Sequence, residues 1–324
     1  MDAMKGRIQA ICMSAKKGTA KSCVEKAEVR VDFGIVGDAH AGNWHRQVSL
    51  LSAETIAAFR AKGADVQPGA FGENLIIEGV DLKQAPVGTR FRLGDVLLEV
   101  TQIGKECHSH CAIYRVMGDC IMPREGLFAK VLQGGAVGIG DELIVEYPAL
   151  DRPLTAAVIT LSDKGAVGAR VDESGPVVAD LLHQAGYAVV ETMLLPDEQK
   201  ELEAALINLA DRRQVSLVIT TGGTGFSVRD RTPEATLAVA TRNAPGIAEA
   251  IRYGSLGVTK RAMLGRGVSV IRNQTLIINL PGSVKAVRES LSFIIDALEH
   301  GIQILRGTAS ECGQGEALLH RPTA

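Results

Sequence analysis

The sequence has no apolar run approaching the roughly 20 residues that a membrane-spanning helix needs, and its first residues lack the long apolar stretch of a secretory signal. It also lacks a surplus of either charge: 35 Lys and Arg stand against 37 Asp and Glu, and each half of the chain is close to balance. Proteins that bind nucleic acid through its phosphates usually carry a basic surplus. We therefore expect a cytoplasmic protein that contacts neither membrane nor nucleic acid.

Cysteine is scarce as well, with 6 in 324 residues, which is too few for a disulfide framework. Three of the six lie close together, at Cys107, Cys111 and Cys120. This crowding indicates chemistry or metal binding. We expect Cys12 and Cys23, in contrast, to be small buried apolar residues.

The length is sufficient for two domains of ordinary size, and the two halves have different patterns. The first half consists of short β-rich runs separated by glycine, such as RIQAICMSA, RQVSLLS and TRFRLGDVLLEV. Only residues 53–62 and 126–132 have a helical pattern. Many short strands with few helices indicate a mainly-β barrel or sandwich, and we assign this domain to residues 1–148.

In the second half, apolar strands alternate with amphipathic helices. Near-continuous Val, Ile and Leu runs, such as LTAAVITLS and VSLVITT, are typical of a mainly parallel sheet covered by helices on both faces, which is a three-layer α/β domain. Helices are expected at 176–186, 198–213, 233–241 and 284–305. We assign a linker to 149–153, the α/β domain to 154–306 and a loose C-terminal tail to 307–324.

In an open parallel sheet, ligands bind at the carboxyl ends of the strands. The third strand of the second half ends in a glycine-rich turn, whose backbone N–H groups can approach an anion closely and whose threonine hydroxyls add donors. No Gly-Lys-Ser/Thr follows, so this is not a Walker A loop, and such a turn alone often serves only as a bend. The candidate ligand-binding residues of the turn are Thr221, Gly222, Gly223, Thr224 and Gly225.

Two aspartates sharpen this interpretation. Asp197 follows the second strand and Asp230 follows the glycine turn, so both are expected at the same edge of the sheet. A pair of carboxylates beside a phosphate site is a common way to hold Mg²⁺. Two alternatives stay open: Asp197 as the N-cap of the next helix, and Asp230 as an ordinary loop residue. Residues 232–234 are expected to be the N-cap, first-position proline and first-turn acid of a helix.

Two more polar turns are expected at this edge. The first strand of the second half runs into Ser162 and Asp163, and the last strand runs into Pro281, Gly282 and Ser283, ahead of a helix with free N–H groups. Convergence of four polar turns fits a substrate with several phosphates, or two phosphorylated substrates bound together.

The segments ITLSDKG, LLPDEQ, ITTGGTGFSVRDRTPEAT and VSVIRNQTLIINLPGSVKAV resemble the MogA/MoaB family of molybdenum-cofactor biosynthesis, which includes molybdopterin adenylyltransferase. The resemblance covers residues 154–305. It implies a typically trimeric α/β domain that binds molybdopterin and transfers AMP from MgATP to the molybdopterin phosphate. By the same resemblance, Asp197 and Asp230 are the two functional acids, near which metal is held, and residues 222–225 and 281–283 are ligand-binding turns.

In the first half, the run GKECHSHC brings Cys107, His108, His110 and Cys111 together. Thiolates and imidazoles this close suit a soft metal, although their spacing fits no standard zinc pattern. The surrounding segments GIVGDAHAGNWHRQVSLLS, FGENLIIEGVDL and RLGDVLLEVTQIGKEC resemble a MOSC domain, the module related to the C-terminal part of molybdenum-cofactor sulfurase. That resemblance implies that Cys107 binds molybdenum or carries sulfur. The added histidines and Cys111 depart from the family pattern and leave the ligand set and the reaction open.

Polar residues gather in a glycine-rich loop of this half: Asp38, His40, His45 and Arg46. They either line an anion pocket for a pterin phosphate or form a solvated loop. Glu73 and Asn74 are expected to hold a turn in place rather than to contact substrate.

Both resemblances indicate one pathway. We therefore predict a bifunctional protein with Mg²⁺ as cofactor, with ATP and molybdopterin as substrates, and with molybdenum or molybdenum cofactor at the MOSC domain. Molybdenum-insertion proteins and molybdoenzymes are candidate partners. The alternatives are a non-enzymatic carrier of molybdopterin or molybdenum cofactor, and a metal sensor built on the Cys and His cluster.

Overall fold

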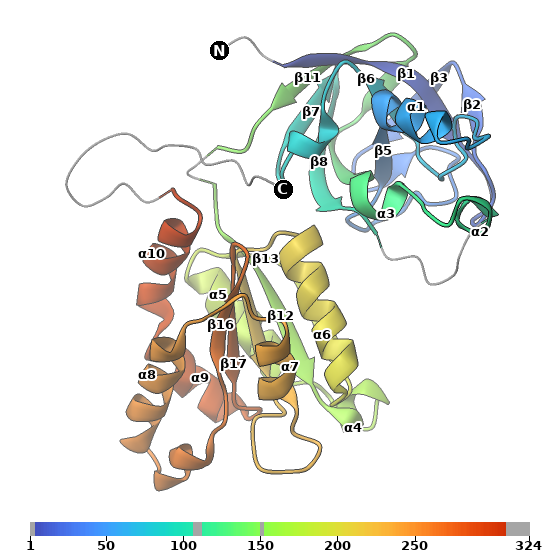
Figure 1. Ribbon diagram of the computed structural model, residues 1–324. Coiled ribbons are helices and arrows are strands. Elements are labelled where there is room, and N and C mark those ends of the chain that lie inside the picture. Colours follow the sequence, from blue (N-terminus) through green and yellow to red (C-terminus); the bar gives the residue numbers. More distant parts are fainter. Residues whose placement is uncertain (1–3, 106–111, 150–151, 309–324) are drawn as a thin grey trace. The chain divides into compact units, whose positions relative to one another are not determined.

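The structure is a computed structural model that describes residues 4–105, 112–149 and 152–308. The chain divides into two compact units, Met1–Ala149 and Leu150–Ala324, which are described separately (Figure 1). Across the described ranges, we find no helix with the length and apolar character needed to cross a bilayer.

The N-terminal unit is a seven-stranded barrel. Its strands follow one another in the order β11, β7, β8, β9, β5, β6 and β1, and antiparallel pairing of β1 with β11 closes the ring. Their bounds are β1 (Lys5–Met13), β5 (Val48–Ser52), β6 (Leu75–Glu78), β7 (Arg90–Leu93), β8 (Val96–Ile103), β9 (Leu127–Gln133) and β11 (Glu142–Glu146). Closure removes the unpaired edges that an open sheet of this size would expose.

Shorter elements surround the barrel. Strand β2 pairs with β1, and β10, β3 and β4 form a separate sheet. These elements are β2 (Ser22–Val24), β3 (Lys26–Arg30), β4 (Gly34–Ile35), β10 (Gly135–Gly138), α1 (Ala53–Ala61), α2 (Ala112–Met117), α3 (Met122–Glu125) and the short 3-10 helix η1 (Leu82–Gln84).

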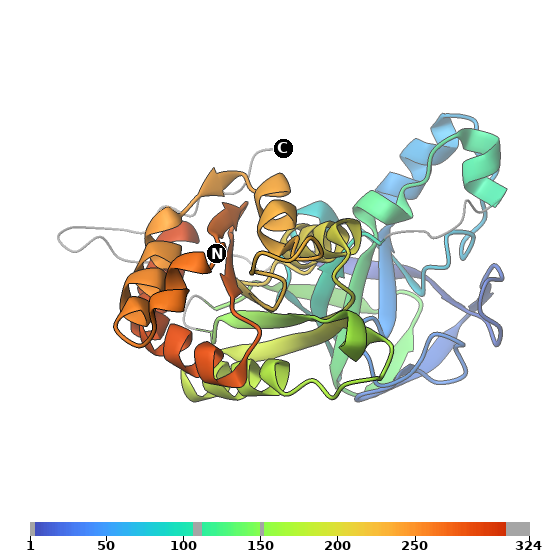
Figure 2. The same cartoon turned by 90° about the horizontal axis from the view of Figure 1, so that it is seen from below.

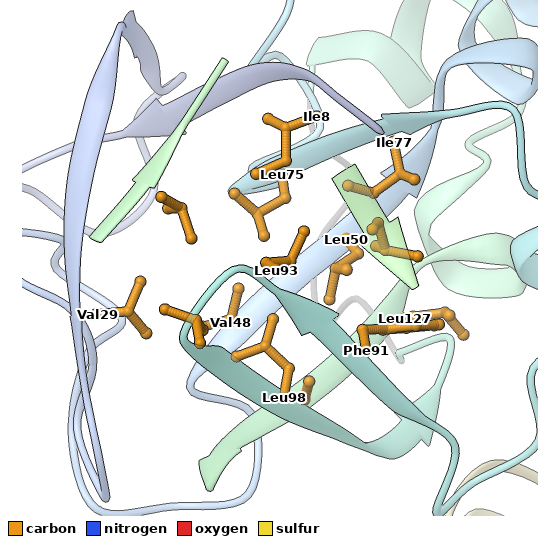
Figure 3. Packing of buried hydrophobic residues seen from close by; sticks show 14 of the residues in the cluster. Ile8, Val29, Val48, Leu50, Leu75, Ile77, Phe91, Leu93, Leu98 and Leu127 are labelled. Atoms are coloured by element: carbon orange, nitrogen blue, oxygen red, sulfur yellow. The ribbon is translucent and has the colours of Figure 1, made fainter. Parts of the chain in front are cut away.

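Alternating side chains from the barrel strands fill its interior. Figure 3 shows Ile8, Leu50, Leu75, Phe91 and Leu98 among the buried residues that pack together there. A second cluster lies on the outer side of the sheet, where Phe59 of α1 packs edge-to-face on Phe71 with ring centroids 5.6 Å apart. The barrel thus has one core inside and a satellite core under α1.

The structure corrects two sequence expectations in this unit. Residues 126–132, expected to be helical, form most of strand β9, in which Leu127, Ala129 and Val131 are buried against β5 and β8. The helix expected at 53–62 is present as α1. Cys12 is buried as expected, but Cys23 is exposed.

The C-terminal unit contains a six-stranded sheet in the order β13, β12, β14, β17, β16 and β15. The first four are parallel to one another, and the last two pair antiparallel. The sheet is therefore mixed, although the sequence pattern indicated a mainly parallel one. The strands are β12 (Thr155–Leu161), β13 (Ala188–Leu195), β14 (Leu217–Thr221), β15 (Arg242–Asn243), β16 (Ser269–Arg272) and β17 (Thr275–Leu280).

The reason for the mixed sheet is a tight hairpin. Arg272 of β16 pairs directly with Thr275 of β17, which leaves a two-residue turn, and Asn273 adopts a left-handed φ of 52°. Asparagine tolerates this backbone conformation in hairpin turns. A two-residue turn can join only antiparallel strands, because a parallel connection needs a long crossover.

Helices cover both faces of the sheet, which gives three layers (Figure 1, Figure 2). One face is covered by α5 (Ser174–Gln184), α8 (Pro245–Leu256), α9 (Val284–Ser292) and α10 (Ile295–Leu305), and the other by α6 (Gln199–Ile207), the π-helical turn η2 (Asn208–Arg212) and α7 (Thr232–Ala238). The sequence pattern missed α8, and it merged α9 and α10 into one helix. Short helices α4 (Asp163–Ala166) and η3 (Lys260–Leu264) lie in the connections.

Candidate active site

Four polar turns meet at the carboxyl edge of the parallel strands, as the sequence predicted. Strands β13, β12, β14 and β17 end in register, with Leu161 opposite Leu195, Thr160 opposite Thr221, and Thr221 opposite Leu280. The residues that follow these strands are therefore neighbours in space.

The glycine turn after β14 packs directly on the turn after β17. The N–H of Gly222 donates to the carbonyl of Leu280 over 3.2 Å, and the hydroxyl of Thr221 donates to the carbonyl of Pro281 over 2.8 Å. A Cβ on Gly282 would lie 3.2 Å from Cα of Gly222. These glycines let two backbone turns touch, which brings two predicted ligand-binding segments together.

Two hydrogen bonds with Asp163 hold Asp197 in place. Its Oδ2 accepts a hydrogen bond of 3.0 Å from the N–H of Asp163, and its own N–H donates to Oδ1 of Asp163 over 3.0 Å. The cap position of α6 is Glu198, so the alternative in which Asp197 caps that helix is wrong. Partial burial raises the pKa of Asp197, and the negative charges of Asp163 and Asp230 raise it further.

Asp230 lies against the same turn, next to Gly225. Its Oδ2 accepts a hydrogen bond of 2.8 Å from the N–H of Ser227. The same oxygen lies 2.9 Å from the place that a Cβ on Gly225 would take, and Oδ1 of Asp197 lies 3.1 Å from the corresponding place on Gly223. Both carboxylates therefore lie against glycines of one turn.

An arginine links the turns across this edge. Arg229 makes a two-pronged ion pair with Asp163, over 3.0 and 2.8 Å, and also pairs with Glu198 over 2.8 Å. The hydrogen bonds from Arg229 lower the pKa of Asp163. Asp163 thus contacts both Arg229 and Asp197 and links them. Its position after β12 alone did not indicate this role.

The sequence interpretation missed two residues that support the glycine turn. Arg266 donates to the carbonyls of Gly225 and Asp230 over 2.7 and 2.6 Å, and also pairs with Glu234. Thr232, expected to be an N-cap, instead donates its hydroxyl to the carbonyl of Gly222 over 2.9 Å. The cap position of α7 is Arg231.

Two predicted ligand-binding serines have capping roles in this structure. The Ser162 hydroxyl accepts from the N–H of Gly165 over 3.0 Å at the start of α4, and the Ser283 hydroxyl accepts from the N–H of Ala286 over 3.3 Å at the start of α9. A capping hydroxyl fixes the direction of the helix N-terminus. Both residues still lie at the edge where the turns meet.

A cavity of about 320 Å³ opens beside the glycine turn. Its volume is within the range of small-molecule sites. Sequence analysis could not find it, because one wall is the missed helix α8. The residues that line it include Thr224, Gly225, Asn279 and Pro281 from the strand-end turns, Ile251, Arg252 and Ser255 from α8, and Arg261 and Leu264 from η3.

In the N-terminal unit, the predicted polar loop packs on the end of β8. Nε2 of His45 lies 2.9 Å from Oε1 of Gln102, and the Arg46 guanidinium lies 4.6 Å from the centre of the Trp44 ring. Asp38 forms an ion pair with Lys21, with both side chains 1% exposed. Glu73 accepts from the N–H groups of Gly69 and Phe71, so it holds a turn as predicted.

Cys107, His108, His110 and Cys111 lie outside the described residues. Within the described ranges, no group of three or more His, Cys, Asp or Glu side chains is arranged to hold a metal ion.

Known proteins resemble both halves of this chain. Residues 157–300 match the family described as "Probable molybdopterin binding domain". The molybdopterin adenylyltransferase of Escherichia coli K12 is 39% identical over 183 residues, which cover 52% of this chain and 94% of that protein. This chain belongs to the molybdopterin adenylyltransferase family.

Other relatives fall on the same half. The molybdopterin adenylyltransferase of Haemophilus influenzae is 42% identical over 159 residues, which cover 48% of this chain and 80% of that protein. The molybdopterin biosynthesis enzyme MoaB from Thermus thermophilus, whose crystal structure is known, is 40% identical in sequence. The match covers 47% of this chain and 96% of that chain, with a TM-score of 0.45.

Residues 37–144 match the family described as "MOSC domain". Both predicted resemblances are thus confirmed. The molybdopterin adenylyltransferase family is one of nucleotidyltransferases, which confirms the predicted enzyme class, and its relatives support a role in molybdenum-cofactor biosynthesis.

Proposed function

We propose that the C-terminal unit transfers AMP from MgATP to the phosphate of molybdopterin. The observation that carries this proposal is that Asp197 and Asp230 lie against Gly223 and Gly225 of one turn, and that Thr224 and Gly225 of the same turn line the cavity of about 320 Å³. Two acids, a glycine turn and a cavity of small-molecule size are what a site for a nucleotide and a second phosphorylated substrate requires.

The glycine turn is the proposed cradle for the phosphates. Its backbone can approach an anion closely, because Gly222 and Gly223 have left-handed φ values of 101° and 62° and carry no side chain. The cavity, with the apolar residues Ile251 and Leu264 and the cations Arg252 and Arg261 along its wall, is the proposed site for a ring system that carries a phosphate.

The two aspartates fit the magnesium ion that accompanies ATP. Mg²⁺ prefers carboxylate oxygens and usually takes only one or two from the protein, with waters and substrate phosphates completing its shell. Among the described residues, hydrogen bonds are found to Oδ2 of each aspartate and not to Oδ1. Burial raises the pKa of Asp197, and the negative charges of Asp163 and Asp230 raise it further; because of these charges, a cation at this place would be favoured.

In the proposed reaction the molybdopterin phosphate attacks the α-phosphorus of ATP in line, and pyrophosphate leaves. The ion supplies neutralisation of phosphate charge when it is bound. The protein orients the reacting groups. Asp163 holds Asp197 by hydrogen bonds, and Arg266 holds the backbone of Gly225 and Asp230. The glycine turn positions the phosphates. No covalent intermediate on the protein is needed.

Incubation of the full chain with molybdopterin and MgATP, followed by chromatographic detection of adenylated pterin, tests the proposal. Wild type should form the product, and Asp230→Asn should lower the rate at least ~100-fold while pterin still binds. Asp180→Asn, an exposed aspartate on α5, is the matched control and should keep the wild-type rate. Pterin binding by wild type without product would leave a carrier role, and full activity of Asp230→Asn would remove that residue from the mechanism.

For the N-terminal unit we propose that Cys107 binds molybdenum or molybdenum cofactor, or carries sulfur. The match to the MOSC family supports this proposal, as does the polar cluster of His45, Gln102 and Arg46 beside the end of β8, just ahead of Cys107 in the chain. Elemental analysis for molybdenum and cyanide-labile sulfur, on wild type and Cys107→Ser, would test it. Equal content in both proteins would exclude Cys107.

We also propose that the chain assembles as a trimer through its C-terminal unit, as the resemblance to the MogA/MoaB family implies. Analytical ultracentrifugation of the full chain would measure its mass in solution. A monomer or dimer at micromolar concentration would contradict the proposal.

A further inference from the structure

Two cysteines face each other across a strand pair of the N-terminal unit. Strands β1 and β2 lie next to each other (Figure 1) and are antiparallel. In their register, Cys12 is directly opposite Cys23. Their sulfur atoms lie 3.6 Å apart. Neither cysteine is among the predicted residues of the polar loop or of the site in the C-terminal unit, and none of the functions above uses the pair.

The backbone pattern shows why the side chains are so close. The N–H of Cys12 donates to the carbonyl of Asn74 over 2.7 Å, and the carbonyl of Cys12 accepts from the Asn74 side chain over 3.1 Å. Both polar groups of Cys12 therefore point away from β2, which makes Cys12 and Cys23 a non-hydrogen-bonded pair. In such pairs the Cα atoms are about 4.5 Å apart and the side chains approach most closely. This spacing is within the range of disulfides.

The two thiols differ in access to solvent. Cys23 is exposed, whereas Cys12 is fully buried in the cluster under α1. Burial raises the pKa of the Cys12 thiol, and the neighbouring Cys23 raises it further, while the Lys21 ammonium acts in the opposite direction. An exposed thiol beside a buried one gives the pair an entry sulfur and a resolving sulfur.

We propose that Cys12 and Cys23 form a reversible dithiol–disulfide site, oxidised by a low-molecular-weight disulfide RSSR. The thiolate of Cys23 attacks one sulfur of RSSR, a Cys23–SR bond forms, and the first RS⁻ leaves and takes up the proton that Cys23 lost. The thiolate of Cys12 then attacks Sγ of Cys23, and the second RS⁻ leaves with the Cys12 proton. The balance is two protein thiols and one RSSR consumed, one protein disulfide and two RSH formed.

The site is placed to affect the predicted polar loop. Strand β2 begins directly after Lys21, whose ammonium pairs with Asp38, and Asp38 also accepts from the N–H groups of Ser14 and His40. The bond would close the segment from Cys12 to Cys23 covalently, and this segment contains Ser14 and Lys21, which both contact Asp38. Oxidation should therefore stabilise the loop that carries His40.

Oxidised glutathione is the probe, applied to the reduced full-length chain. Free thiols are then blocked with N-ethylmaleimide, and peptides are mapped by mass spectrometry, so that Cys107, Cys111 and the remaining cysteines are distinguished. The expected product is a Cys12 peptide joined to a Cys23 peptide and lighter by two hydrogens, with no glutathione on Cys23. Dithiothreitol should reverse it. Fluorescence of the single tryptophan, Trp44, should show an unfolding midpoint raised on the order of 5 °C in the oxidised form.

Two variants separate the steps. Cys12→Ala removes the resolving thiol, so glutathione should accumulate on Cys23, and Cys23→Ser should leave Cys12 unmodified. Three results in wild type would overturn the proposal without either variant: glutathione that persists on Cys23 while Cys12 stays reduced, Cys23 joined to a different cysteine, or both thiols unchanged in excess oxidant.

Discussion

The carboxylates of Asp163 and Asp197 each accept a hydrogen bond from the backbone N–H of the other residue, and both bonds are 3.0 Å long. This reciprocal pair ties the turn after β12 to the turn after β13. It occupies Oδ2 of Asp197, while Oδ1 lies against Gly223. Asp197 is therefore fixed by backbone geometry, with its other oxygen at the proposed phosphate site.

The raised pKa of Asp197 predicts that Asp197→Asn separates activity from stability. An acid whose pKa is higher in the folded than in the unfolded state costs stability when it is ionised. The amide oxygen can still accept from Asp163, so the variant should lose adenylation at least ~100-fold and yet unfold at a higher temperature than wild type. Calorimetry of both proteins would measure this difference.

The pH dependence gives the sign of this effect. The wild-type carboxyl stabilises fully below the unfolded pKa of an aspartate and loses that contribution as pH rises through its raised folded pKa. The advantage of Asp197→Asn should therefore be absent near pH 3 and present near pH 7. A variant that is less stable than wild type at neutral pH would show that the negative charge of Asp197 stabilises the turn. It would contradict the expectation that ionisation of Asp197 costs stability.

Gly223→Ala should damage the site through its backbone and through crowding. Gly223 has a φ of 62°, and a Cβ there would lie 2.3 Å from Oγ1 of Thr232 and 3.1 Å from Oδ1 of Asp197. We expect a loss of about 1–2 kcal/mol from the left-handed conformation alone and at least a ~10-fold loss in kcat/KM from displacement of Asp197.

Gly186→Ala is the matched control for this substitution. Gly186 has a φ of 86°, but nothing lies within 4 Å of its Cβ position, and it precedes β13 at the opposite end of the strand from Asp197. Its stability loss should be about 1–2 kcal/mol, from the left-handed conformation alone and without the cost of crowding, and its kcat/KM should be unchanged. Equal losses of activity in both variants would mean that strain rather than the contact with Asp197 is responsible.

The overall arrangement of strands and helices in each half could be predicted because buried strands have a recognisable pattern of Val, Ile and Leu runs. Where the prediction failed, tertiary contacts rather than local sequence preference determined the secondary structure. Residues 127–133, LFAKVLQ, contain good helix formers, but pairing with β5 and β8 on both sides makes them a strand. Helix α8 was missed because of its glycines, and Gly254 is required there: a Cβ would lie 2.7 Å from the Phe293 ring.

The residues of the candidate site could be predicted only where their position follows directly from the order of the strands. Asp197, Asp230 and the glycine turn come immediately after or close to strands, so their shared edge follows from topology. Arg266 is separated from Asp230 by 36 residues and joins it through a backbone carbonyl, a contact that leaves no local pattern in the sequence. The cavity wall from α8 was inaccessible for the same reason.

Arg266→Lys should lower kcat more than it changes KM. The guanidinium donates to the carbonyls of Gly225 and Asp230 in two directions, and a lysine ammonium keeps the charge but not this fork. We expect at least a ~10-fold fall in kcat because the Asp230 loop is less well positioned. Arg288→Lys, an exposed arginine on α9, is the control and should behave as wild type. If Arg266→Lys raised only KM, Arg266 would act in binding and not in positioning.

The buried ion pair between Lys21 and Asp38 should be essential to the N-terminal unit. Both side chains are 1% exposed, so Lys21→Met leaves the Asp38 carboxylate buried without its counter-charge, at an expected cost of about 3–5 kcal/mol. Lys5→Met removes an exposed partner of Glu142 and should cost at most about 1 kcal/mol. Urea unfolding followed by Trp44 fluorescence reports on this unit alone, because Trp44 is the single tryptophan of the chain. Equal midpoints for the two variants would show that the hydrogen bonds from Ser14 and His40 suffice to hold Asp38, and that Lys21 does not stabilise the loop.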